Sequence, residues 1–488
     1  MDRRTKIVAT LGPACSDESI IERLLKAGVN VFRLNFSHGT HTEQENRIRL
    51  IREISDRTKH PVTILQDLQG PKIRTGELKE GSVYLEQGQT FTLTTEPILG
   101  DEHKVSVDFH DLPDSVRPGG RILLDDGNLE LVVVQVEEKT IETKVVLGGE
   151  LKPHKGVNLP GARLNIPSLT EKDKSDLAFG LQHDVDAIAL SFVRRANDIV
   201  GLRQMIARLD AESKYTPIIA KLERPEALDN LEEIVGIADG VMVARGDLGV
   251  EMSPEAVPIA QKRIIEAANR HAKVVITATQ MLESMIHNPR PTRAEATDVA
   301  NAIFDGTDAV MLSGETAIGK YPVQSVEIMD AIIRQAEAQL EKWGHWHGEV
   351  GEGVEEALAA GKPTHDDALS ITRAARELAH DRNVAAIAVF TQTGRTAHLM
   401  AKARPSVPIL AFTPVERTYR QLPLLWGVTP YLVPYSNTLE DMLDCVEDTI
   451  VSDTPIQRGQ QVVLISGFPV GALRPPNIAL LHTIGEIP

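Results

Sequence analysis

The stretch TPIIAKLERPEALDNLEEIVGIADGVMVARGDLGVE, residues 216–251, decides the fold that we expect for this chain. It contains two short apolar runs, 217–220 and 240–244, joined by a helical pattern over 226–237. Apolar runs of this length that alternate with helices are typical of buried parallel strands. Lys221 and Glu223 follow the first run, and Asp247 follows the second. Their charges should therefore meet at one mouth, where α/β proteins place their sites.

This group of charges has a definite chemistry. Two carboxylates with few other ligands suit Mg²⁺, because this ion keeps positions open for substrate oxygens. A lysine beside them suits a phosphate or an enolate. A surface salt bridge and a Gly-Asp turn are the alternative, since both are common. Their occurrence on two successive strands favours a site.

Composition indicates a globular protein of more than one domain. The 488 residues are 42% apolar and 25% charged. A formal net charge of −17 argues against a nucleic-acid-binding surface. Cys15 and Cys445 are the only cysteines, so we expect neither a disulfide framework nor a cysteine metal cluster, and a cytoplasmic location fits. We also expect no signal peptide and no membrane span.

Eight apolar runs alternate with helical patterns along the chain. They lie at 6–11, 29–36, 62–67, 187–193, 217–220, 240–244, 273–279 and 308–313. This order predicts an α/β fold with a (β/α)₈ TIM barrel. A doubly wound sheet is the alternative, but eight evenly spaced strands favour a closed barrel. Polar residues stand at most strand ends, as such a barrel requires: Arg33, Asn35, Asp67, Ser191, Lys221, Glu223, Asp247, Thr279, Ser313 and Glu315.

The barrel pattern is interrupted once and followed by a further domain. Short alternating β runs over 72–166 predict an all-β domain inserted after the third strand, with Gly/Pro hinges at 70–76 and 155–161. We assign 1–71 and 167–345 to the barrel, 346–364 to a linker and 365–488 to a C-terminal α/β domain. His345 and His347, at the start of the linker, are only a weak metal signal.

The motifs KIVATLGP, VFRLNFSHG, GPKIRTG, KGVNLPG, AKLERPEAL, VMVARGDLGVE, TATQMLESM and MLSGETAIGKYP follow one another across nearly the whole chain. Together they resemble the pyruvate kinase family, and TATQMLESM and ARGDLGVE are the most specific. The resemblance implies phosphoryl transfer from phosphoenolpyruvate to ADP in glycolysis, giving pyruvate and ATP. It also implies a homotetramer.

The resemblance further implies roles for individual residues. Glu223 and Asp247 would hold Mg²⁺ or Mn²⁺. The catalytic residues would be Lys221, Arg33, Thr279, Ser313 and Glu315. The substrate would also meet Ala244, Arg245, Gly246 and Asp247, largely through backbone amides. The nucleotide would meet Asn35, Phe36, Ser37, His38, Arg74 and Lys155, under the inserted domain acting as a lid. Capping of the next helix would explain Ser313 and Glu315 equally well.

One departure from the family concerns K⁺. Many members hold K⁺ with an Asn, a Ser, an Asp and a Thr, near a Glu. Asn35, Ser37 and Asp67 are present here, but Leu68 replaces the Thr and Lys72 replaces the Glu. The Lys72 ammonium could supply the charge of K⁺ and would repel a cation. We therefore predict K⁺ independence. The alternative is that Lys72 is a solvated hinge residue and K⁺ still binds.

The C-terminal domain contains VFTQTGRTAH at 389–398, in which a strand, a Thr/Gly loop and a helix start suggest a phosphate-binding nest. In the family this position receives phosphorylated effectors. The candidates are Thr391, Thr393, Gly394, Arg395 and Thr396. Two other functions stay open: a Mg²⁺-dependent aldolase or lyase that forms an enolate, and a catalytically silent metabolite sensor.

Overall fold

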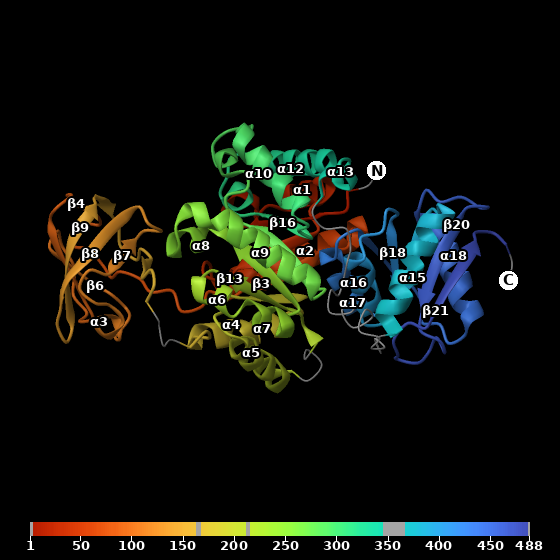
Figure 1. Ribbon diagram of the computed structural model, residues 1–488, viewed down its shortest axis with the longest axis horizontal. Helices are drawn as coiled ribbons and strands as arrows, with labels where there is room; N and C mark the ends of the chain where they lie inside the picture. The colour runs from red at the N-terminus through yellow and green to blue at the C-terminus, as the bar shows by residue number, and fades with distance from the viewer. Residues whose placement is uncertain (1–2, 163–166, 211–214, 345–366, 487–488) are drawn as a thin grey trace, which may run out of the picture.

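The computed structural model describes residues 3–162, 167–210, 215–344 and 367–486. Figure 1 shows three bodies along its long axis, with the barrel between a small β domain and a C-terminal α/β domain. The predicted linker 346–364, both linker histidines and the end of the predicted inserted domain at 163–166 lie outside the described residues. Within the described ranges, no helix has the length and apolar character needed to span a membrane.

The middle body is a closed barrel of eight parallel strands, which confirms the predicted fold. Around the barrel the strand order is β1-β16-β15-β14-β13-β12-β3-β2, so neighbours in sequence are neighbours in space. Side chains such as Val8, Leu65, Ile219 and Met242 are fully buried and fill the interior. The strands are β1 (Lys6–Leu11), β2 (Val31–Asn35), β3 (Thr63–Asp67), β12 (Ala187–Leu190), β13 (Ile218–Leu222), β14 (Gly240–Ala244), β15 (Val274–Ala278) and β16 (Ala309–Leu312).

Amphipathic helices cover the outside of the barrel, and local capping sets where they begin. Asp17 accepts the Ser19 N–H at the start of α1, and Thr170 accepts the Asp173 N–H at the start of α4. The helices are α1 (Glu18–Ala27), α2 (His41–Thr58), α4 (Glu171–Gln182), α5 (Ala196–Leu209), α6 (Pro225–Asp229), α7 (Leu231–Ile237), α8 (Arg245–Glu251), α9 (Val257–Arg270), α10 (Arg293–Phe304), α11 (Gly314–Ala317), α12 (Pro322–Glu337) and α13 (Leu340–Trp343).

The insertion after β3 is an all-β domain with its own apolar core. A six-stranded sheet has the order β11-β7-β8-β9-β5-β6, and β4 pairs with β10. Its elements are β4 (Val83–Leu85), β5 (Thr90–Thr94), β6 (Lys104–Ser106), α3 (Leu112–Ser115), β7 (Arg121–Leu124), β8 (Leu129–Val136), β9 (Thr140–Leu147), β10 (Gly149–Leu151) and β11 (Val157–Asn158). The two hinges run side by side, because Arg74 pairs with Gly156 across an antiparallel bridge.

The C-terminal domain is a five-stranded sheet in the order β19-β18-β17-β20-β21, and only β21 runs antiparallel. Its strands are β17 (Ala386–Phe390), β18 (Ile409–Thr413), β19 (Val428–Leu432), β20 (Gln461–Ser466) and β21 (Ile478–Thr483). Its helices are α15 (Asp367–Arg382), α16 (Arg395–Lys402), α17 (Glu416–Gln421) and α18 (Leu439–Asp453).

Three details differ from the sequence-based expectations. Strand β13 continues to Leu222, so Lys221 lies inside the strand. The helical pattern 226–237 forms two helices, because the backbone leaves helical geometry at Asn230. Helix α16 begins at Arg395, so two of the five effector candidates belong to the helix and not to the loop before it.

Candidate active site

Lys221 is the centre of a buried cluster at the carboxyl ends of the barrel strands. Its Nζ lies 2.8 Å from Glu223 Oε1 and 3.1 Å from Asp67 Oδ1, and it donates to Ser191 Oγ at 2.7 Å. Burial alone would lower the pKa of Lys221, but Asp67 and Glu223 outweigh burial and raise it. The lysine is therefore a fixed positive charge at neutral pH.

Arg33 adds a second cation to the same cluster. Its Nε lies 2.6 Å from Asp67 Oδ2, and its Nη1 donates to Thr10 Oγ1 at 3.2 Å. Although burial pushes the pKa of Asp67 upward, Lys221 and Arg33 hold it below the ordinary value. Asp67 therefore stays ionised and orients both cations. The pairing of Arg33 with Asp67 keeps the guanidinium close to Lys221, which pairs with the same carboxylate.

The two predicted metal ligands, Glu223 and Asp247, lie close enough to influence each other. Glu223 Oε2 accepts the Phe192 N–H at 2.8 Å. Burial raises the pKa of Glu223, Lys221 opposes this, and the charge of Asp247 raises it further. In the part of the chain that the structure describes, the Asp247 carboxylate has no hydrogen bond or ion pair. Two mutually repelling carboxylates, one without a partner, suit a hard divalent cation.

Helix α8 begins directly after β14, and its second residue, Gly246, contacts the turn that follows β15. The Gly246 N–H donates to Thr279 Oγ1 at 2.7 Å. Thr279 and Gln280 both have positive φ, 65° and 54°, which is costly for residues with a Cβ and is typical of functional sites. A polar ligand at this point would meet the Thr279 hydroxyl and the first N–H groups of α8.

Arg245 takes a different place from the other predicted substrate residues. Its side chain is buried, donates to the Thr279 carbonyl at 2.8 Å and pairs with Asp298 at 2.7 Å. It also donates to the Gln280 carbonyl. The guanidinium therefore holds the strained turn in place, and only the main chain of Arg245 can serve a ligand.

Ser313 and Glu315 follow β16 at the same end of the barrel. Glu315 is fully buried, and its two oxygens accept the N–H groups of Leu282 (3.0 Å) and Ser313 (2.7 Å). Ser313 precedes α11 but its side chain makes no capping hydrogen bond, so capping does not explain it. Among the described residues, Ser313 Oγ is a buried oxygen without a partner. Glu315 thus holds the segment, and Ser313 offers the unused hydroxyl.

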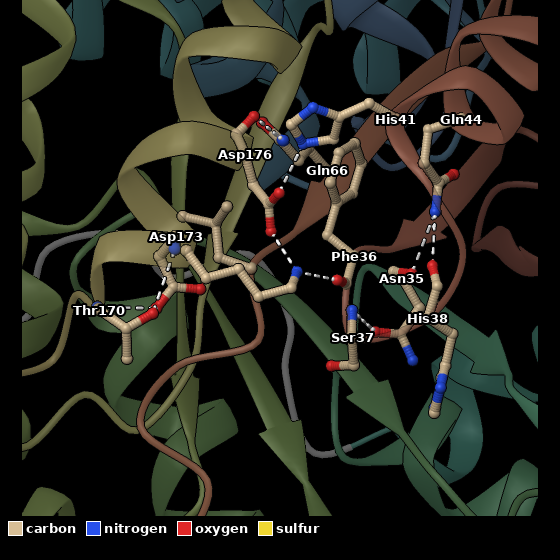
Figure 2. Close-up of polar contacts among 12 residues, drawn as sticks. Asn35, Phe36, Ser37, His38, His41, Gln44, Gln66, Thr170, Asp173 and Asp176 are labelled. Atoms are coloured by element: carbon tan, nitrogen blue, oxygen red, sulfur yellow. Dashed lines mark hydrogen bonds and ion pairs between the residues drawn. The ribbon is translucent and has the colours of Figure 1, made fainter.

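Four of the predicted nucleotide residues, Asn35 to His38, lie at the end of β2 and on the loop after it, which Figure 2 shows in close-up. Asn35 Oδ1 accepts the Ser37 N–H at 3.1 Å, which closes the loop tightly. Across from the loop, Arg74 Nη1 donates to the His154 carbonyl at 3.0 Å, and Lys155 pairs with Asp125 at 2.7 Å.

The charges of this region act on His38. Burial, and then the charges of Arg74, Lys72, Arg33 and Lys172, lower the pKa of His38. Barrel and hinge cations therefore share one neighbourhood, as a polyphosphate site requires.

Four of the five predicted effector residues, all except Gly394, line a cavity of about 210 Å³ in the C-terminal domain. Thr391 Oγ1 accepts the Gly394 N–H at 3.0 Å, and Gly394 has a left-handed φ of 80°. Arg474, from the loop between β20 and β21, also lines this cavity.

Several residues that build the site carried no clear sequence signal. Thr10 orients Arg33, and Ser191, which the sequence placed only at a strand end, orients Lys221. On α4, Lys172 contacts the nucleotide loop, Asp173 contacts the hinge, and Asp176 pairs with Lys172 and His41. A polar residue within or directly after a buried strand is the signal that could have marked Thr10. The α4 residues resemble ordinary charges in the first turns of a helix.

Comparison with known proteins agrees with this geometry. Residues 2–326 match the family model for the pyruvate kinase barrel domain, and residues 369–482 match that for the pyruvate kinase alpha/beta domain. The pyruvate kinase of Corynebacterium glutamicum is 44% identical over 486 residues, covering 100% of this chain and 98% of the relative. That of Geobacillus stearothermophilus is 45% identical, covering 100% of this chain and 81% of the relative.

The solved structures include a close counterpart. The crystal structure of a pyruvate kinase from Cryptosporidium parvum superimposes with a TM-score of 0.89 at 36% identity, covering 99% of this chain and 96% of that chain. With both family models, full-length relatives and the eight-stranded barrel in agreement, the chain belongs to the pyruvate kinase family and is a phosphotransferase.

Proposed function

We propose that the chain transfers the phosphoryl group of phosphoenolpyruvate to ADP, as a cytoplasmic step of glycolysis. The bond from phosphorus to the enol oxygen breaks, a bond to a β-phosphate oxygen of ADP forms, and a proton at the enol carbon gives pyruvate. The observation that carries the proposal is Lys221, held by Asp67 and Glu223 beside Arg33 at the barrel mouth. Phosphoryl transfer needs such charge neutralisation and positioning more than covalent chemistry.

The residues present fit a divalent metal. Glu223 and Asp247 are the proposed ligands, because they repel each other and Asp247 has no other partner in the described ranges. Mg²⁺ or Mn²⁺, when bound, would neutralise the substrate carboxylate and phosphate. Lys221 and Arg33 would face the moving phosphoryl group, and Lys221 would stabilise the negative charge left on the enol oxygen.

The remaining residues would orient the substrate and supply the proton. The N–H groups around Gly246 and Asp247 would bind the substrate carboxylate, which would take over the hydrogen bond that Gly246 now makes to Thr279. Thr279 and Ser313 would pass a proton toward the enol carbon, and Glu315 would hold Ser313 in position. Closure of the inserted domain would bring Arg74 and Lys155 onto the ADP phosphates and exclude water.

The test is pyruvate formation from phosphoenolpyruvate and Mg²⁺, with and without ADP. We expect pyruvate to form only with ADP, in equal amount to ATP. Release of pyruvate from a 4-hydroxy-2-oxo acid by carbon–carbon cleavage, without ADP, would instead favour an aldolase or lyase. Absence of both activities, with ligand binding at the C-terminal cavity, would favour a sensor.

We also propose that the enzyme is independent of K⁺. The Leu68 side chain carries no oxygen that could replace the Thr ligand, and it is fully buried. The Leu68 carbonyl accepts the Ser191 hydroxyl at 2.6 Å. Both oxygens of Asp67 are paired with cations. Lys72 acts electrostatically on His38, next to the predicted remnant ligand Ser37. Its ion pair with Asp126, at 3.6 Å, keeps it at the hinge.

The K⁺ proposal predicts equal activity with and without K⁺ at saturating Mg²⁺. The double variant Leu68→Thr/Lys72→Glu restores an oxygen ligand and removes the resident cation. We expect its activity without K⁺ to fall about tenfold or more and to recover when K⁺ is added. Kinetic assays in potassium-free buffer test both expectations. An unaltered chain that works only with K⁺ would show that Lys72 is a solvated hinge residue.

Regulation and assembly complete the proposal. The Thr391–Thr396 region would bind the phosphate of a phosphorylated effector, which the Gly394 nest and the cavity support. The active unit would be a homotetramer, as the family resemblance implies.

A further inference from the structure

The nucleotide loop is held at three main-chain carbonyls by two helices (Figure 2). From α2, Gln44 Nε2 donates to the carbonyls of Asn35 (3.2 Å) and His38 (3.0 Å). From α4, Lys172 Nζ donates to the Phe36 carbonyl at 2.6 Å. The loop conformation that would receive the nucleotide therefore depends on where α4 places the Lys172 ammonium.

Asp176, one turn along α4, determines that placement. Its Oδ2 lies 2.6 Å from Lys172 Nζ, and its Oδ1 lies 2.7 Å from His41 Nε2 at the start of α2. The Asp176 side chain is 4% exposed, whereas those of Lys172 and His41 are 49% and 43% exposed. A half-exposed lysine loses considerable rotamer freedom when it is fixed. The buried carboxylate is the rigid element that fixes both Lys172, which contacts the loop at Phe36, and His41, which begins α2 after the loop.

Other contacts tie this part of α4 to the barrel and the hinge. Gln66 Nε2, in β3, donates to the Asp176 carbonyl at 2.7 Å. Asp173, one turn earlier, accepts the Gly70 N–H at 3.0 Å where the hinge begins. Phe179 stacks on the His41 ring with centroids 4.4 Å apart. The first turns of α4 thus contact β3, the nucleotide loop and the lid hinge together.

We infer that Asp176 is a positioning residue for the nucleotide: it holds Lys172 and His41 so that the loop from Asn35 to His38 keeps its binding conformation. This inference rests on the proposed use of that loop by ADP. A merely structural carboxylate would contribute to folding without favouring one substrate over the other. A positioning carboxylate on this loop should act on ADP and leave phosphoenolpyruvate, bound around Lys221, unaffected.

The test is Asp176→Asn, which keeps the shape and removes the charge. We expect KM for ADP to rise about tenfold, as for loss of a hydrogen bond to a charged group, with KM for phosphoenolpyruvate unchanged. Asp176→Glu keeps the charge and is expected to recover part of the affinity for ADP. It also provides a second variant if Asp176→Asn folds poorly.

Asp186→Asn is the matched control. Asp186 is as buried as Asp176, accepts the Ile64 N–H at 2.7 Å and pairs with Arg52 at 2.8 Å. It precedes β12, however, and therefore lies at the end of the barrel opposite to the active site. We expect it to leave both KM values unchanged. The inference would be overturned if Asp176→Asn had the same KM for ADP as the unaltered enzyme. It would also be overturned if Asp186→Asn raised KM for ADP as much as Asp176→Asn does.

Calorimetric titration of ADP with Mg²⁺ separates this inference from the proposed function. If the unaltered chain binds no ADP, both fail. If it binds ADP and Asp176→Asn binds it equally well, only the positioning role fails.

Discussion

Replacing Lys221 by Met is expected to lower kcat for phosphoryl transfer by about 10²- to 10³-fold, the usual effect of removing a preorganised donor to a developing anion. Met keeps the volume of the side chain but cannot neutralise the enol oxygen or the phosphoryl group. Arg33 and the carboxylates Glu223 and Asp247 remain, so phosphoenolpyruvate with Mg²⁺ should still bind. Single-turnover kinetics and calorimetric titration of phosphoenolpyruvate measure the two quantities separately.

Removal of Lys221 also leaves Asp67 and Glu223 without a shared partner, so stability must be followed in the same variant. A thermal melt shows whether the variant is folded at the assay temperature. Lys26→Met is the control, because Lys26 is 62% exposed and, among the residues that the structure describes, pairs only with Glu22 on α1. It should leave kcat unchanged. Near-normal turnover in a folded Lys221→Met protein would refute the role of Lys221. Arg33 would then be the residue that neutralises the charge of the phosphoryl group.

The barrel could be predicted because its strands are buried on both faces and therefore appear as continuous apolar runs. The predicted strand at 240–244 matches β14, but the run at 217–220 was ended too early. The reason is physical: a lysine normally marks the end of a buried strand, but Asp67, Ser191 and Glu223 satisfy the Lys221 ammonium inside the barrel mouth. Asp67 and Ser191 lie at or just after the ends of other strands, so the sequence around Lys221 does not reveal them.

The same limit explains the missed elements and contacts. Strand β19 contains Pro430, which removes a ladder N–H and suppresses the strand signal, although an edge strand tolerates it. Arg245 was predicted to meet the substrate largely through its backbone, which stays a prediction, whereas the contacts of its side chain with the Thr279 carbonyl and Asp298 were not anticipated. The contact between Asp176 and His41 joins residues 135 positions apart, so only the folded barrel brings them together.

Replacing Asp308 by Asn is expected to destabilise the junction between the barrel and the C-terminal domain by about 3–5 kcal/mol, the cost of breaking a buried ion pair. Asp308 is 1% exposed, pairs with Lys402, and lies 2.8 Å from Arg404. Asn keeps the shape but leaves two buried cations uncompensated. Urea unfolding followed by tryptophan fluorescence reports the loss, because Trp426 lies 4.3 Å from the Arg404 guanidinium.

The loss should also depend on pH. Burial, opposed by Asp308 and assisted by Arg404, lowers the pKa of Lys402 from 10.5 to about 8. Between these values the folded chain has released a proton that the unfolded chain still holds, so stability rises with pH. Without Asp308 the pKa of Lys402 falls further, and this rise begins at lower pH. The deficit of Asp308→Asn should therefore be larger at pH 7 than at pH 9.5.

Asp305→Asn provides the comparison that isolates burial of the cation. The side chain of Asp305 is also buried, at 4% exposure. Its partner Lys262, however, is 51% exposed and can turn into water. Its loss should cost only about 1 kcal/mol or less from the ion pair. If Asp308→Asn were no worse than Asp305→Asn, or if its deficit were equal at both pH values, Lys402 and Arg404 would not be buried cations that need Asp308. The junction would then be held by apolar packing around Trp426 and α16, and the ion pair would be dispensable.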